Sequence, residues 1–84
     1  YLELQSIWPN PFSESISLCF EGSDSSSIDY YIINSVGQEV KTGNLEIVSG
    51  VTVKKIDLNS LAHGLYYLKI LIDDEWKTYK LIKN

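Results

Sequence analysis

Few side chains of this chain of 84 residues could carry out covalent chemistry. Cys19 and His63 are its one cysteine and one histidine, so they form the only possible thiol–imidazole pair. Cys19 lies in an alternating apolar segment without a neighbouring cation to activate its thiol, and His63 lies in a turn. There is no Gly-x-Ser-x-Gly elbow and no glycine-rich phosphate loop. We therefore expect a packed thiol, a surface imidazole and no enzymatic activity.

Acidic side chains gather at Asp73-Asp74-Glu75, where a hairpin tip is predicted. Solvated acids at such a tip lack the apolar pocket that turns a carboxyl group into an acid catalyst. A weak calcium site at this tip, or at Asp24, stays open, although the chain has no EF-hand pattern. One cysteine excludes a disulfide framework and a multi-cysteine zinc site. We expect neither a cofactor nor a resident metal.

The charge is acidic overall and basic at the end of the chain. The formal net charge is −4 and there is no arginine, which argues against nucleic acid as a partner. The apolar runs are far shorter than a membrane span, so no direct membrane insertion is expected. Lys77, Lys80 and Lys83 fall within the last eight residues, which contain no acid. We expect these lysines to be solvated on an open face of the last strand.

The elements that would position these residues are strands, because the apolar residues repeat with a period of two. Ile16, Leu18 and Phe20, for example, share one face of their segment. No segment sustains a period of 3.6 residues, so we expect no helix beyond one turn near Asn59. The alternation predicts seven strands, at about Leu2–Ile7, Ser15–Glu21, Ile28–Ile33, Glu39–Val48, Val51–Leu58, Leu65–Ile72 and Trp76–Ile82.

Turn residues separate these segments. Gly37 is expected at a left-handed hairpin position. Pro9 and Pro11 flank Asn10, and because proline donates no backbone hydrogen bond, residues 8–12 are expected to leave the sheet. Seven short strands with regular turns are typical of an all-β protein, here an immunoglobulin-like antiparallel β-sandwich formed by residues 1–84 as one domain.

One turn resembles the tyrosine corner of sandwich domains. Leu61 precedes Gly64 by three residues, and Tyr66 follows that glycine by two, at the head of the longest apolar strand. We expect Leu61 to cover the core, Gly64 to supply an unusual φ angle, and the Tyr66 hydroxyl to bond to the backbone between Asp57 and Leu61. Tyr66, Leu68 and Ile70 should be among the most buried residues.

The whole pattern resembles a known family, the C-terminal sorting domains of the type IX secretion system of Bacteroidota. The segment Trp8–Phe12 (Trp-Pro-Asn-Pro-Phe) is similar to the family's Tyr-Pro-Asn-Pro-Phe opening, with tryptophan in place of tyrosine. An Asn-x-x-Gly-Gln turn at 34–38 and an Asp-Leu-x-x-Leu-x-x-Gly-x-Tyr block at 57–66 follow in the family's order. The basic end at 80–84 matches its last block, so the resemblance covers nearly the whole chain.

The resemblance implies a secretion signal at the end of a longer secreted protein, of which this chain is a fragment with Asn84 as its terminus. Such a domain sends its cargo through the periplasm and across the outer membrane, to the cell surface or the medium. The implied partners are the outer-membrane translocon and shuttle components, and a sortase-like peptidase that cleaves the domain and attaches the cargo to the surface.

The resemblance places partner recognition at the end of the chain, in Lys80, Leu81, Ile82, Lys83 and Asn84. A sandwich edge can accept a partner strand, and lysines would complement an acidic receptor. The same lysines could instead only protect the edge against aggregation.

An alternative function is an accessory module that binds carbohydrate or spaces domains. Trp8, Trp76 and Tyr79 would then form exposed, coplanar rings, whereas a sorting domain should bury them.

Overall fold

The computed structural model describes residues 1–84 as seven antiparallel strands without a helix. No helix long and apolar enough to cross a membrane is present. The strands lie within one residue of their predicted bounds, apart from the third strand, which begins two residues earlier. They are β1 (Leu2–Trp8), β2 (Ser15–Gly22), β3 (Ser26–Asn34), β4 (Glu39–Ile47), β5 (Gly50–Asp57), β6 (Gly64–Ile72) and β7 (Glu75–Lys83).

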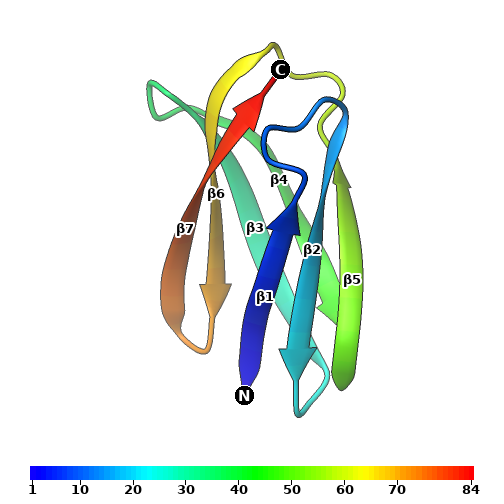
Figure 1. Ribbon diagram of the computed structural model, residues 1–84. Coiled ribbons are helices and arrows are strands. Elements are labelled where there is room, and N and C mark those ends of the chain that lie inside the picture. Colours follow the sequence, from blue (N-terminus) through cyan, green and yellow to red (C-terminus); the bar gives the residue numbers. More distant parts are fainter.

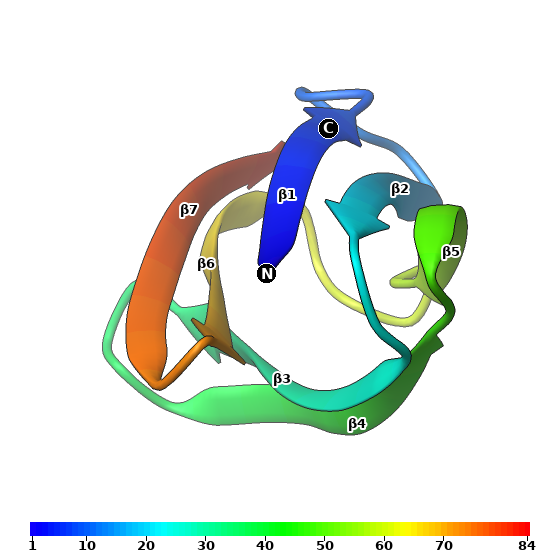
Figure 2. The same ribbon diagram turned by 90° about the horizontal axis from the view of Figure 1, so that it is seen from below.

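The strands form two sheets that pack face to face, which confirms the predicted β-sandwich (Figures 1 and 2). One sheet has the order β1-β2-β5 and the other the order β4-β3-β6-β7. The fourth strand pairs with the third instead of the fifth, unlike its place in immunoglobulin constant domains. β1 and β7 are edge strands on the same side of the molecule (Figure 1).

The core follows from the alternation of apolar residues on each strand. In β6, Tyr66 is 7% exposed, and Leu68 and Ile70 are fully buried between the sheets, as predicted. Their neighbours on the outer face of the sheet are half-buried. Seventeen buried hydrophobic residues, from both sheets and from the segments at Phe12 and Leu58, form a single core cluster between the sheets.

The residues at two hairpin turns suit the backbone conformations that these turns require. Gly37 has a φ of +90°, which a side chain would strain, and Asn34 closes the turn by accepting hydrogen bonds from the Val36 and Gln38 amides. Asp73 and Asp74 both have positive φ between β6 and β7. Asx residues tolerate this conformation, so the acidic tip is a two-residue hairpin turn.

Residues 8–12, which were expected to leave the sheet, do so only in part. Trp8 pairs with Ser17 as the last residue of β1, so only the residues after it leave the sheet. Both prolines follow cis peptide bonds. Phe12 returns into the core, where it is 1% exposed, and it forms an isolated parallel bridge with Lys83. The segment is therefore packed against the last strand and is not a free loop.

Candidate recognition surface at the chain terminus

The crossover from β5 to β6 is a tight, internally bonded turn. Asp57 Oδ1 accepts a hydrogen bond from the Asn59 amide at 3.0 Å, and the Leu61 amide donates to Leu58 O at 3.2 Å. The Tyr66 hydroxyl donates to Ala62 O at 2.6 Å, one residue beyond the predicted span. Gly64, between them, has a φ of +147°. The corner bond is thus closer in sequence to the tyrosine than expected.

Lys83 is buried, and its expected solvation is wrong. Its residue exposure is 8%, and its Nζ donates to Leu58 O at 2.7 Å, Asn59 O at 3.1 Å and Leu61 O at 2.6 Å. All three ammonium protons therefore have partners, as a buried lysine requires. The side chain ties the last residues of β7 to the β5–β6 crossover.

The Trp8–Phe12 segment holds the other side of β7. The Asn10 side-chain amide donates to Lys80 O at 2.9 Å, and its oxygen accepts from the Ile82 amide at 3.0 Å. The Phe12 amide donates to Ile82 O, and the Asn84 amide donates to Phe12 O, both at 2.8 Å. The Asn10 side chain therefore makes the two hydrogen bonds to β7 that the backbone of a neighbouring strand would make.

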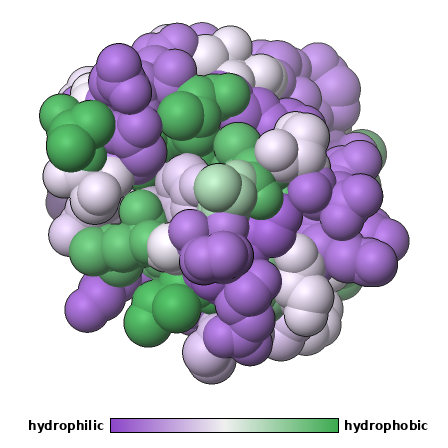
Figure 3. All heavy atoms as spheres, turned by 90° about the horizontal axis from the view of Figure 1, so that it is seen from above, coloured by the Kyte–Doolittle hydropathy of each residue, from purple (hydrophilic) through white to green (hydrophobic).

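These contacts bring three separate sequence blocks together at the end of the sandwich where the chain terminates (Figure 1). The turn between β3 and β4, which contains Gly37, lies at the same end (Figure 1). Seen from above, this end is a mosaic in which hydrophobic groups are separated by hydrophilic ones (Figure 3). The surface has no continuous apolar face there.

The five residues at the end of the chain divide by their orientation. Leu81 is fully buried and Lys83 nearly so, whereas Lys80, Ile82 and Asn84 are exposed. The outward backbone groups of Ile82 are already bonded to Asn10 and Phe12. At Ile82, therefore, the edge has no free backbone group for the partner strand that the sequence analysis expected.

The aromatic side chains fit neither of the two expected arrangements. Trp8 and Trp76 are 42% and 48% exposed, so burial was wrongly expected for both. The ring of Trp76 is tilted by 52° from that of Tyr31, and the Lys69 ammonium lies 4.9 Å from its centre. Trp76 therefore forms a cation–π contact and no flat stack with Tyr31. Tyr79, the third ring of the expected platform, is half-buried and packs against the core, so the three rings do not form one exposed platform.

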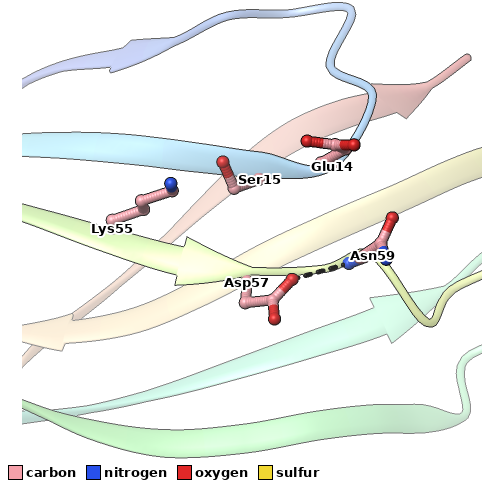
Figure 4. A pocket seen from close by; sticks show the side chains of 5 residues that line it. All are labelled: Glu14, Ser15, Lys55, Asp57 and Asn59. Atoms are coloured by element: carbon pink, nitrogen blue, oxygen red, sulfur yellow. Dashed lines mark hydrogen bonds between the residues drawn. The ribbon is translucent and has the colours of Figure 1, made fainter.

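A polar hollow lies between the ends of β2 and β5 (Figure 4). Glu14, just before β2, and Asp57, the last residue of β5, both line it, but Figure 4 shows their carboxylates pointing apart. Nowhere do three or more histidine, cysteine, aspartate or glutamate side chains gather as a metal site would need. At the acidic tip, Asp73 Oδ2 instead accepts a hydrogen bond from the Leu2 amide at 3.1 Å.

The burial of Lys83 had a signal in the sequence. Along a strand, residues two apart share a face, so Lys83 shares the face of Leu81 and Tyr79. The contacts of Asn10 with β7 had no such signal. They depend on how two distant strands meet.

Comparison with known protein families matches residues 6–84 to the secretion system C-terminal sorting domain. The searches of curated proteins and of solved structures returned no match. The matched range contains the three blocks that meet at the end of the sandwich. This chain therefore belongs to the family of C-terminal sorting domains, the targeting modules that direct proteins through the type IX secretion system.

Proposed function

We propose that this domain is read by the secretion machinery as a folded unit, at the end of the sandwich that contains Lys80–Asn84. The observation that carries the proposal is that Asn10 and Lys83 hold this segment from two sides. Held in this way, Lys80, Ile82 and Asn84 present one defined surface, while Leu81 and Lys83 face inward and maintain it. Unfolding would remove that surface.

Family membership supports the finer steps of the proposal. The domain would lie at the C-terminus of a longer secreted protein that reaches the periplasm by its own signal. The outer-membrane translocon and shuttle components would bind the domain and export the cargo to the cell surface or the medium. A sortase-like peptidase would then cleave the domain and attach the cargo.

A reporter with a periplasmic signal, fused ahead of residues 1–84, tests the proposal in a host with an active type IX system. The reporter should reach the medium or the cell surface. Lys80→Glu should reduce export, because it reverses an exposed charge beside the terminus. The matched control is Lys55→Glu, the same change at an exposed position of the other sheet.

Retention of the unmodified fusion in the periplasm, with the domain folded and the system active, would defeat the assignment. Equal export of the Lys80→Glu and Lys55→Glu variants would remove Lys80 from the recognition surface. Both variants should unfold at nearly the same temperature as the parent, because exposed charges contribute less than about 1 kcal/mol.

A further inference from the structure

The two edge strands, β1 and β7, lie side by side without a ladder between them (Figures 1 and 2). Hydrogen bonds bridge the gap near both ends. At one end the Leu2 amide donates to Asp73 Oδ2 in the β6–β7 turn, at 3.1 Å. At the other, Asn10 bonds to Lys80 O and to the Ile82 amide. Between these bridges the edges remain open.

A groove of about 220 Å³ occupies the opening. Half-buried Leu4, Ile7 and Tyr79, which pack against the core, and buried Leu81 provide its apolar surface. No acidic residue lines it, and Lys80 is its one charged residue. The groove therefore suits a segment that has apolar side chains and an acidic residue close to Lys80.

The backbone of β7 beside this groove has unused hydrogen-bonding groups. Its register with β6 runs without a shift over the whole strand. Lys80 O and the Ile82 amide point away from β6, toward the groove. Because every second residue of a strand directs its backbone groups to the same side, the Thr78 amide and carbonyl also point away from β6. No strand pairs with β7 on that side. Unpaired edge groups of this kind are a template for a further strand.

The chain itself adds an extended segment to the same edge, directly beyond this stretch. Phe12 bridges Lys83 in parallel, and its amide bonds to Ile82 O. The edge thus already accepts a main-chain partner from Ile82 onward, and the Asn10 side chain occupies Lys80 O. On the Thr78 side of these contacts no partner is bonded to the edge.

From this geometry we propose that the groove between β1 and β7 binds an extended segment of a secretion-machinery protein as an added strand along Thr78–Lys80. The inference rests on the proposed function and names the partner's binding mode. Main-chain hydrogen bonds to β7 supply affinity, the apolar floor takes alternate side chains, and Lys80 pairs with an acidic one. The Asn10 bridge fixes where the added strand must end.

Thr78→Pro in the reporter fusion removes the outward amide but no β6–β7 hydrogen bond, since proline is tolerated on an edge whose amide faces outward. Thr78→Val is its matched control, because it keeps the amide and the side-chain shape. One lost main-chain bond should lower export on the order of fivefold for Thr78→Pro. Thr78→Val should export normally, and thermal unfolding of both purified domains checks folding.

A photoreactive benzoylphenylalanine in place of Gln5, which lines the groove, supplies a direct readout in exporting cells. The control position is Val53, exposed on the three-stranded sheet. A cross-link to a type IX component from position 5 and not from 53 supports the proposal. A cross-link only to the cargo itself, or none during active export, overturns it.

If Thr78→Pro fails to fold, Ser6→Arg replaces it, because Ser6 is exposed and lines the groove. Its control is Val53→Arg. Normal export of a folded variant with an altered groove would mean that the open edge of β7 binds no partner strand and only limits aggregation. The proposed function would still stand. Failure of the unmodified fusion to leave the periplasm defeats the proposed function instead.

Discussion

The Lys83 ammonium donates to the Leu61 carbonyl oxygen at 2.6 Å and so joins the last strand to the β5–β6 crossover. Its two further bonds go to Leu58 and Asn59, so every acceptor is a backbone carbonyl and no carboxylate takes part. Charge-assisted hydrogen bonds of this kind are stronger than neutral ones. The basic end of the chain therefore contains one lysine that supports the fold and one, Lys80, that is open to solvent.

Replacing Lys83 with methionine keeps the aliphatic stem and leaves three carbonyls without their donor. We expect a loss of roughly 1–3 kcal/mol in the free energy of unfolding, because unsatisfied buried acceptors are costly. Urea denaturation measures it. Lys80→Met is the control and should change stability by less than about 0.5 kcal/mol. Equal effects of the two substitutions would show that the burial of Lys83 contributes nothing to stability.

Tyr66→Phe removes the hydroxyl that donates to Ala62 O while it keeps the buried ring. The domain should lose about 1–2 kcal/mol of stability, since the bond is partly buried and closes the crossover. The control is Tyr67→Phe, on the outer face of the same strand. If chemical denaturation finds the same stability for parent and Tyr66→Phe, the hydroxyl does not pin the crossover.

The sequence predicted the strands because alternation is a local property. Each of Ile16, Leu18 and Phe20 needs only its neighbours to reveal its face. It did not predict the surroundings of Lys83, since the three carbonyls that solvate it lie 22 to 25 residues away in the chain. A lysine is usually exposed, but Lys83 shares the inward face of its strand with Leu81. Tertiary contacts decided between the two.

The same limit applies to the recognition surface. The resemblance marked Asn10 and the end of the chain as separate blocks, and neither block reveals that one bonds to the other. Their separation in sequence is 72 residues for the Ile82 amide and the Asn10 side chain. Only the packing of β1 against the edge of the opposite sheet places them together.

Asn10→Ala removes both side-chain bonds to β7, one to Lys80 O and one from the Ile82 amide. Since the site is exposed, the cost should be modest, about 0.5–1.5 kcal/mol. A more specific readout is hydrogen exchange, which should become faster at the Ile82 amide. Asn59→Ala is the matched control, because the Asn59 side chain takes no part in these contacts. Unchanged exchange at Ile82 in Asn10→Ala would contradict the bridging role.

Tyr30 gives the domain an alkaline pH dependence. It is 7% exposed, and its ring lies so close to Gly43 on β4 that a Cβ there would come within 2.6 Å of its hydroxyl. Burial raises the pKa of Tyr30 above its usual value of 10.0, because the phenolate would lose its hydration. The folded state therefore holds the phenol proton at pH values where the unfolded chain releases it.

The sign of the effect follows from this difference in proton binding. Below pH 10 the phenol is protonated in both the folded and the unfolded state, so Tyr30 leaves stability independent of pH. Above pH 10 the unfolded chain binds fewer protons than the folded one, so the free energy of unfolding falls as pH rises through the folded-state pKa. Tyr30→Phe has no phenol at this position and therefore lacks this pH-dependent part of the stability. Its stability should decline less steeply above pH 10 than that of the parent. Parallel curves for Tyr30→Phe and the parent in urea titrations from pH 7 upward would show that another group causes the alkaline loss.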